Sequence, residues 1–256
     1  MSTVAKAISL LEVLGSGAPE AALADIAKVA GFDKATTRRL LVSLIAQGLV
    51  EQDETTRLYR LGAGLTRLAL MREAQFPLLR MAVPAVEALA ARTGETVHLS
   101  EYTKRGLLTV HVIESAKANR VSVRLGEVLP MHATASGIAF LAFADERMRA
   151  AIFAGPMPAF TPFTIGDAAL LAEHAAAARA RGHSIGAQGF EEGVMSVAAP
   201  ILGADGHAIG TIAVAAPRVR TQQSDIERLG ADVTAAARDI GERLFGRHDS
   251  ARQKRA

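Results

Sequence analysis

Two hydroxyl and three cationic side chains stand together between residues 34 and 39 of this sequence. The segment consists of Lys34, Ala35, Thr36, Thr37, Arg38 and Arg39. Lysine and arginine neutralise phosphates, arginine can bind guanine through two hydrogen bonds, and threonine can bond a phosphate or touch a thymine methyl group. A helix that begins here also directs the positive end of its dipole outward. These residue types predict a contact with double-stranded DNA at the start of a helix.

The residues on both sides predict the two helices that would hold this segment. Apolar residues recur at helical spacing from Leu23 to Ala30, and Gly31 interrupts the pattern. Asp33 can cap the next helix, whose apolar face consists of Leu40, Leu41, Leu44 and Ile45. The pattern is typical of a helix-turn-helix.

An earlier helix and a later hairpin complete the expected unit. Val4, Ile8, Leu11 and Leu14 share one predicted helix face, which we expect to pack against the helix pair. Residues 49–52 and 57–61 are predicted strands joined by a turn. Arg57 lies near the tip of this hairpin, or wing, and is expected to reach phosphate or the minor groove. A helical bundle with a solvated basic turn is the competing interpretation, but helix order, glycine break and hairpin together favour DNA binding.

Composition limits the remaining possibilities. The 256 residues are 50% hydrophobic, which is enough for two compact domains. The net charge is only +3, so the local basic cluster argues for nucleic acid and the overall charge does not. The absence of cysteine excludes disulfides and agrees with a cytoplasmic protein, and no apolar run reaches membrane length. Aromatic residues make up 4% with no tryptophan, which disfavours stacking on single strands.

The order of predicted elements suggests four regions. We expect a DNA-binding domain over residues 1–62, a helical linker over 63–77, a second domain over 78–246 and a frayed basic tail over 247–256. The second domain combines predicted helices at 78–93, 136–143, 145–153, 167–181 and 224–245 with predicted strands at 96–102, 107–113, 121–125, 196–202 and 208–216. Hairpin connections and interleaved helices imply an α+β fold around an antiparallel sheet.

Three segments of the second domain resemble the IclR family of bacterial transcription regulators. They are residues 94–99 (GETVHL), 129–137 (LPMHATASG) and 189–200 (GFEEGVMSVAAP), and residues 34–41 and 59–62 also resemble that family's recognition helix and wing exit. The resemblance implies a winged helix-turn-helix joined by a helical linker to a GAF-like or PAS-like effector domain. It further implies a dimer or dimer of dimers on palindromic DNA. We expect such a regulator to control operons for the catabolism of small organic acids, aromatic acids included. Pairing two small recognition modules also raises their effective concentration on a symmetric site.

The resemblance also locates an effector pocket. It implies pocket positions in the 132–137 loop and on the later strands: Val121, His132, Thr134, Ala135, Ser136, Gly186, Ser196, Ala213 and Ala215. Thr134 or Ser136 can cap the helix that follows, and the free N–H groups of Ala135 and Ser136 can bind a carboxylate.

This sequence departs from the family pattern inside that pocket. Where members that bind small oxoacids tend to carry an acid, a cysteine and two serines, it has Gly186, Ser196, Ala213 and Ala215. Lost polar groups and added space favour a bulkier, more apolar ligand, so our hypothesis is an aromatic or otherwise hydrophobic carboxylate. In the alternative interpretation the two alanines only pack a tighter sheet, and the pocket is small.

An enzyme is the second function class to consider, with the winged helix used for dimerisation and a small carboxylate turned over in the pocket. His132 near Ser136 suggests a base and a nucleophile, but no acidic partner can be named, so helix capping explains the serine better. Glu191 and Glu192 fit a solvated loop. The seven histidines show no metal-ligand spacing, and no glycine-rich phosphate loop is present. We therefore predict no catalytic residues, no metal and no cofactor. Repression relieved by ligand and activation by ligand both remain open.

Overall fold

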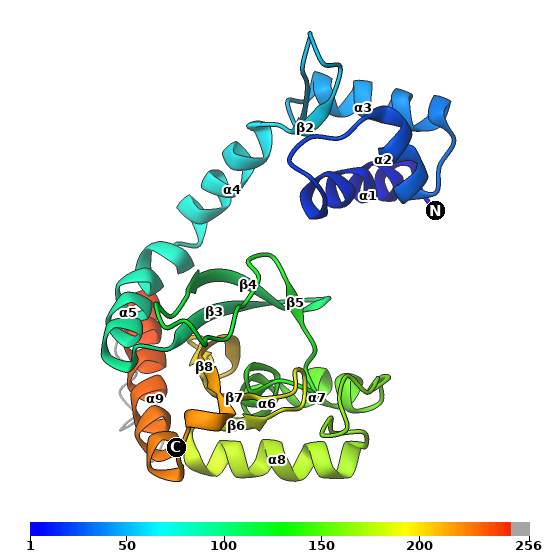
Figure 1. The fold of residues 1–256 in the computed structure, drawn as a ribbon. Coiled ribbons are helices and arrows are strands. Elements are labelled where there is room, and N and C mark those ends of the chain that lie inside the picture. The colour runs from blue at the N-terminus through cyan, green and yellow to red at the C-terminus, as the bar shows by residue number, and fades with distance from the viewer. Residues whose placement is uncertain (247–256) are drawn as a thin grey trace. The chain divides into compact units, whose positions relative to one another are not determined.

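A computed structural model describes residues 1–246 of the chain (Figure 1). Contacts divide the chain into two compact units, one of residues Met1–Pro77 and one that begins at Leu78. The predicted basic tail, residues 247–256, lies outside the described residues. Among the helices of residues 1–246, none is long and apolar enough to cross a membrane.

The first unit is a three-helix core followed by a small hairpin and one further helix. Its elements are α1 (Thr3–Ser16), α2 (Leu23–Ala30), α3 (Lys34–Ala46), β1 (Val50–Gln52), β2 (Tyr59–Leu61) and α4 (Gly64–Gln75). The strands pair antiparallel, with Val50 opposite Leu61. The core contains Leu10, Leu14, Ile26, Leu40, Leu41, Leu44, Val50 and Tyr59. The predicted helix-turn-helix and hairpin are confirmed.

The predicted packing face of α1 is confirmed at Leu14, which belongs to the core, and at Leu11, which packs against it, but it is wrong at Val4 and Ile8. Leu10 and Leu14 are buried, whereas Val4 is 72% and Ile8 is 48% exposed. The helix carries apolar residues on two sides, and the side through Leu10 and Leu14 is the one that meets α2 and α3. The stripe through Val4 and Ile8 therefore remains on the surface of this unit.

The second unit is built on a six-stranded antiparallel sheet in the order β5-β4-β3-β8-β7-β6. Its elements are α5 (Leu78–Thr93), β3 (Thr96–Thr103), β4 (Gly106–Ile113), β5 (Val128–Leu129), α6 (Ala135–Phe143), α7 (Glu146–Phe153), α8 (Ala168–Arg181), β6 (Ser184–Ala187), β7 (Val194–Leu202), β8 (Ala208–Pro217), the short 3₁₀ turn η1 (Arg218–Arg220) and α9 (Gln223–Phe245). In Figure 1, α6 and α8 lie on one side of the sheet and α5 and α9 on the other. The predicted α+β class is confirmed.

One predicted strand of this unit is wrong, and two short strands were not predicted. Residues 121–125 form no strand, although the sequence alternates there. The hydroxyl of Thr96 donates to the carbonyl of Val121 (2.6 Å) and accepts from the N–H of Ser115 (3.1 Å), so a side chain holds the segment beside the sheet in place of a strand ladder. The two edge strands β5 and β6 were not predicted, because Val128–Leu129 and Ser184–Ala187 are too short to show alternation.

A half-buried ion cluster closes the end of the sheet next to this segment. Both carboxylate oxygens of Glu95 bind Arg220, at 3.1 and 2.6 Å, and Lys117 binds one of them at 2.6 Å. Burial by itself raises the pKa of Glu95, but the hydrogen bonds from Arg220 and Lys117 outweigh it and hold that pKa below its usual value of 4.5. A lowered pKa means that ionised Glu95 stabilises the fold at neutral pH, and that this stabilisation is lost as the pH falls below about 4.5.

We expect Glu95→Gln to lower the free energy of unfolding by about 1–3 kcal/mol at pH 7, since charged hydrogen bonds of this kind contribute on that scale. The difference from wild type should shrink as the pH is lowered through 4.5. Urea titrations at pH 7 and pH 4 measure both effects. Glu114→Gln is the matched control, because its partner Arg120 is a surface residue and that pair should matter less. Equal losses for the two variants would contradict the assigned role of Glu95.

Candidate DNA interface and effector cavity

The turn between α2 and α3 is built as the sequence predicts. Gly31 takes a left-handed conformation with φ of 71°, which a residue with a side chain adopts less easily. The carboxylate of Asp33 accepts a hydrogen bond from the N–H of Thr36 (2.8 Å). This bond holds the pKa of Asp33 below its ordinary value, and the charge complements the N-terminal end of the helix.

The exposed face at the start of α3 carries Lys34, Ala35, Arg38 and Arg39, with Thr36 half-buried. Thr37 must be removed from the predicted DNA contacts. Its side chain is completely buried, and its hydroxyl donates to the carbonyl of Asp33 (2.9 Å). Thr37 therefore contributes to the core and to the turn, because its position on the helix points inward toward α1 and α2.

Two residues farther along α3 share this exposed face and were not predicted. Val42 is 57% exposed, and Ser43 is exposed with its hydroxyl bonded to the carbonyl of Arg39 (3.1 Å). They follow Arg38 and Arg39 by four residues, so helical periodicity alone was a sufficient signal.

The wing places Arg57 at its tip. Asp53 accepts hydrogen bonds from the N–H groups of Thr55 (2.9 Å) and Thr56 (2.7 Å), and Arg57 follows with a φ of 61°, unusual for a residue with a side chain. Arg60, on the adjacent strand, binds Glu20 at 3.0 Å and Glu51 at 3.1 Å. The cation left for a partner at this end of the unit is therefore Arg57, which is exposed.

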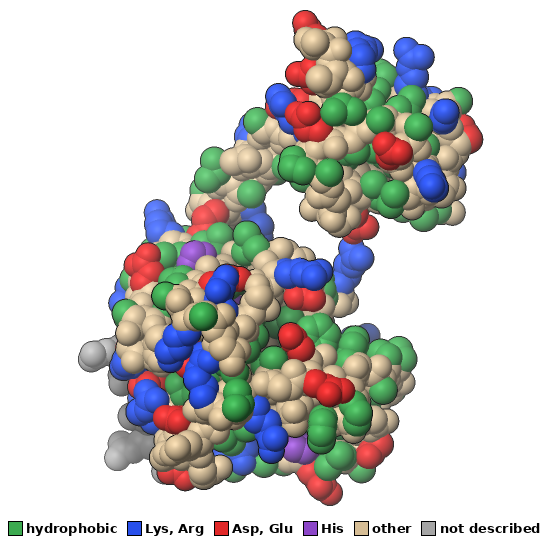
Figure 2. Space-filling model, viewed as in Figure 1, with side chains coloured by type: hydrophobic (Ala, Val, Ile, Leu, Met, Phe, Trp, Pro, Cys, Tyr) green, Lys and Arg blue, Asp and Glu red, His purple; other side chains and the backbone are tan. Residues whose placement is uncertain are grey.

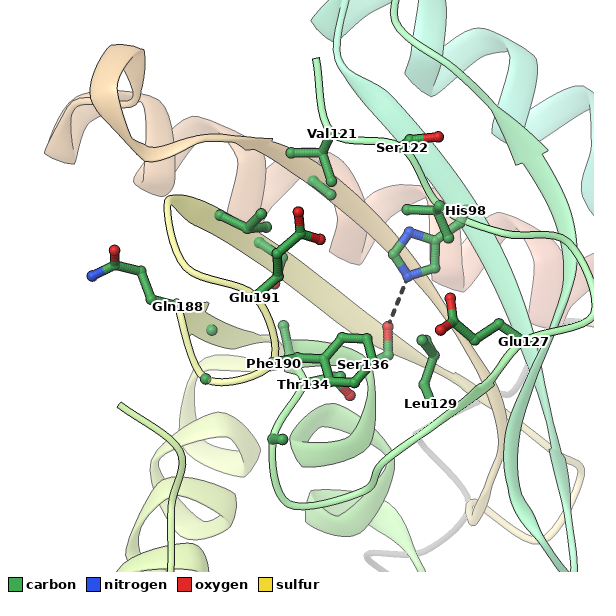
Figure 3. A pocket seen from close by; sticks show the side chains of 18 of the residues that line it. His98, Val121, Ser122, Glu127, Leu129, Thr134, Ser136, Gln188, Phe190 and Glu191 are labelled. Carbon is green, nitrogen blue, oxygen red and sulfur yellow. Dashed lines mark hydrogen bonds between the residues drawn. The ribbon is translucent and has the colours of Figure 1, made fainter. Parts of the chain in front are cut away.

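The second unit encloses a cavity of about 500 Å³ between the start of α6, the sheet and the 121–124 segment (Figure 3). Of the predicted effector-binding residues, this cavity is lined by Val121, Thr134, Ala135, Ser136, Gly186, Ser196 and Ala215. Residues far apart in the sequence thus meet at one place. The structure therefore contains a cavity at the expected place.

The start of α6 presents free backbone donors to this cavity. Thr134 caps the helix, since its hydroxyl accepts from the N–H of Gly137 (3.0 Å) and donates to the carbonyl of Pro130 (2.9 Å). The N–H groups of Ala135 and Ser136 belong to the first turn, where no helical carbonyl can reach them. Gly186 keeps the space beside them open, because a Cβ there would lie 2.9 Å from the nitrogen of Ala135.

His98 is the main lining residue that sequence analysis missed. It extends from β3 and shares a hydrogen bond of 3.2 Å between its Nε2 and the hydroxyl of Ser136. The side chain is 6% exposed, and its Nδ1 has no hydrogen-bond partner among the described residues. Burial lowers the pKa of His98 to about 4, so the imidazole is neutral at neutral pH.

Two predicted pocket residues lie elsewhere. The ring of His132 donates from Nε2 to the carbonyl of Pro158 (3.0 Å), so it faces the 158–165 loop and not the cavity. Ala213 is on the same face of β8 as Ala215 but lies under α6, packed with Ala135, Ala139 and Ala198. Ala213 thus follows the tighter-packing interpretation, whereas Ala215 lines open space.

The cavity is more polar than the sequence suggested. Besides His98, the additional polar lining residues are Ser122, Arg124, Glu127, Gln188 and Glu191, accompanied by the apolar side chains of Val123, Leu129, Phe190 and Val194. Most of them stand in loops that follow no periodic pattern, so the sequence offered no signal for their convergence.

A helix-turn-helix unit followed by a separate α+β unit with a ligand-sized cavity defines a DNA-binding transcription regulator with an effector domain. The family model for the C-terminal domain of the bacterial transcriptional regulator IclR matches residues 73–242, and that for the IclR helix-turn-helix domain matches residues 3–54. The chain belongs to the IclR family of transcriptional regulators.

Individual relatives agree with this assignment. The chain is 31% identical over 201 residues to the glycerol operon regulatory protein of Streptomyces coelicolor, covering 78% of this chain and 79% of that protein. It is 30% identical over 202 residues to the HTH-type transcriptional regulator XynR of Escherichia coli, covering 78% and 80%. The crystal structure of an IclR-type regulator from Silicibacter sp. TM1040 is 37% identical, covers 97% of this chain and 98% of its own, and superposes with a TM-score of 0.83.

Proposed function

We propose that this regulator acts in the cytoplasm on operons for the breakdown of small organic acids, aromatic acids among them. The observation that carries the proposal is the cavity of about 500 Å³ that meets the free N–H groups at the start of α6. Such a helix start attracts a carboxylate, and Leu129, Phe190 and Val194 offer apolar surface to the remainder of the ligand. The proposed effector contacts are Val121, Thr134, Ala135, Ser136, Gly186, Ser196 and Ala215, with His98 added.

Footprinting of the DNA upstream of the protein's own gene, with and without a panel of small acids, tests this proposal. An IclR homolog from Microbacterium hydrocarbonoxydans with the same fold, 24% identical and with a TM-score of 0.82, was crystallised with 4-hydroxybenzoate. This acid is therefore a reasonable first probe. A footprint that no acid alters, together with no binding of acids in calorimetry, would contradict the proposal.

On the DNA side, we assign base and phosphate contacts to Lys34, Ala35, Thr36, Arg38 and Arg39, and a phosphate or minor-groove contact to Arg57. The support is their position at the start of α3 and at the tip of the wing, where all are exposed except the half-buried Thr36. A winged helix of this size contacts only one half-site, so two copies on a palindromic operator are needed for tight binding.

Exposed apolar side chains of the first unit support dimerisation or a dimer of dimers. No residue of α4 is buried. Its apolar residues Leu68, Leu70 and Met71 are 46%, 65% and 52% exposed. Apolar side chains along α4 are visible in Figure 2. Val4 and Ile8 on α1 are a second group of exposed apolar residues, and we propose that a second copy of the chain covers both groups.

We expect the double substitution Ile8→Glu and Leu68→Glu to shift the protein toward a monomer, because charges would then have to be buried in the dimer contact. Sedimentation velocity over a range of protein concentrations measures the shift. Val219→Glu, at a residue 84% exposed in the second unit, is the matched control. An unchanged oligomeric state in the double variant would exclude this surface as the contact.

The enzyme alternative finds little support in the cavity. His98 and Ser136 are bonded, but no carboxylate orients the Nδ1 of His98, which is without a partner in the described part of the chain. A histidine whose pKa has been lowered to about 4 by burial is also a poor base for a serine. We therefore propose that the chain binds its ligand without converting it.

A further inference from the structure

Two carboxylates without partners stand at the effector cavity. Glu127, just before β5, and Glu191, in the loop before β7, line it from separate segments, and Figure 3 shows both among the side chains around His98 and Ser136. None of the hydrogen bonds or ion pairs found among residues 1–246 uses the carboxylate of Glu127 or Glu191. Glu127 is half-buried, and Glu191 is exposed.

The lining offers little positive charge to balance these two acids. Arg124 is the one lysine or arginine in the cavity lining, and its side chain is exposed. His98 is neutral, and the hydrogen bond to Ser136 already engages its Nε2. Its buried Nδ1 is a further polar atom without a partner beside the same cavity. The polar groups near Glu127 and Glu191 therefore do not satisfy them.

A metal ion does not account for the two acids. Within residues 1–246, no group of three or more histidine, aspartate or glutamate side chains is placed to hold a metal ion. The alternative to a ligand contact is that both carboxylates stay in water. That alternative holds only while the cavity is empty, because a ligand that fills it displaces water from Glu127.

We infer that the effector carries, in addition to its carboxylate, a hydrogen-bond donor such as a hydroxyl or amine, and that the carboxylate of Glu127 or of Glu191 accepts from this donor. This inference rests on the proposed function of the cavity. A ligand that covers a carboxylate without donating to it leaves a charged group desolvated and unpaired, which is costly. A second carboxylate on the ligand would add repulsion, so dicarboxylates are excluded. The carboxylate that accepts from the donor is thus a specificity-determining group.

Calorimetry with matched probes on the full-length protein tests the inference. 4-Hydroxybenzoate and 4-methoxybenzoate share a carboxylate and differ in the donor, and 4-hydroxybenzamide and 4-methoxybenzamide form the same pair without the carboxylate. We expect each hydroxyl compound to bind at least about tenfold more tightly than its methoxy partner, as for a hydrogen bond to a charged group. Terephthalate should bind more weakly than 4-hydroxybenzoate.

Variants assign the preference to the two residues. Either Glu127→Gln or Glu191→Gln should reduce the preference for hydroxyl over methoxy and so identify the acceptor, whereas Glu192→Gln, next in sequence but outside the lining, should leave it intact. Equal binding within both pairs, tight binding of terephthalate, or no binding of any probe would overturn the inference. If the amides bind as well as the acids and the hydroxyl preference persists, the inference stands and the carboxylate part of the proposed function fails.

Discussion

Replacing Arg39 with alanine is expected to weaken operator binding by about 1–3 kcal/mol, which is roughly a 5- to 150-fold loss of affinity. Arg39 is exposed on the face of α3 that Lys34, Ala35 and Arg38 share, and its backbone carbonyl accepts the Ser43 hydroxyl. The side chain is therefore free to reach a base or a phosphate. Fluorescence anisotropy on the footprinted fragment measures the effect.

Salt dependence separates the two kinds of contact that Arg39 could make. A phosphate contact would lower the slope of log affinity against log salt by about one, whereas a guanine contact would relax sequence preference at one position. Arg228→Ala is the control for net charge, because Arg228 pairs with Asp225 on the surface of the second unit. Unchanged DNA binding by Arg39→Ala would count against α3 as the recognition helix.

Gly186→Ala is expected to reduce effector affinity at least about tenfold while leaving operator binding without effector intact. The added Cβ would lie 2.9 Å from the nitrogen of Ala135, 3.0 Å from the hydroxyl oxygen of Ser196 and 3.1 Å from the Cβ of Ala135. It would therefore fill the space through which a carboxylate approaches the start of α6. Calorimetry with 4-hydroxybenzoate and mobility-shift assays with and without it measure the two properties.

Gly166→Ala is the matched control, because a Cβ at that position meets no atom within 4 Å. Thermal unfolding of both variants shows whether Gly186→Ala remains folded. Ser196→Ala changes the neighbouring side chain on the same side of the cavity without adding volume. Normal effector binding by a folded Gly186→Ala protein would refute the proposed position of the carboxylate.

The helices and turns that carry a periodic apolar pattern, a glycine break or a capping residue were predictable from the sequence. The Gly31 turn, the Asp33 cap and the buried leucines of α3 follow from local chemistry, and the structure confirms them. On α1 the sequence placed Leu11 and Leu14 correctly but not Val4 and Ile8, because apolar residues lie on two sides of that helix and only tertiary contacts select the buried ones. Thr37 was misplaced for a related reason, since a threonine near a helix start can serve the turn as well as a ligand.

The cavity was only partly predictable. The loop before α6, Gly186 and Ser196 were found through resemblance to a family, whereas His98 and Glu127 meet there through sheet pairing and loop conformation. His98 lies opposite Ala213 on β8, a register that no local pattern specifies. His132 was expected from its place in a motif, yet its bond to Pro158 turns the ring away. Sequence position indicated the neighbourhood but not the direction of each side chain.

The hydroxyl of Thr96 serves two backbone groups at once, the carbonyl of Val121 and the N–H of Ser115. The cavity side formed by the 121–124 segment is therefore fixed in one conformation, and mutations that break these hydrogen bonds should mostly impair folding. On the facing loop, the side chain of Glu191 is exposed and can change without disturbing the sheet. Laboratory evolution toward a new inducer should therefore enrich substitutions in that loop and leave Thr96 and the 121–124 segment unchanged.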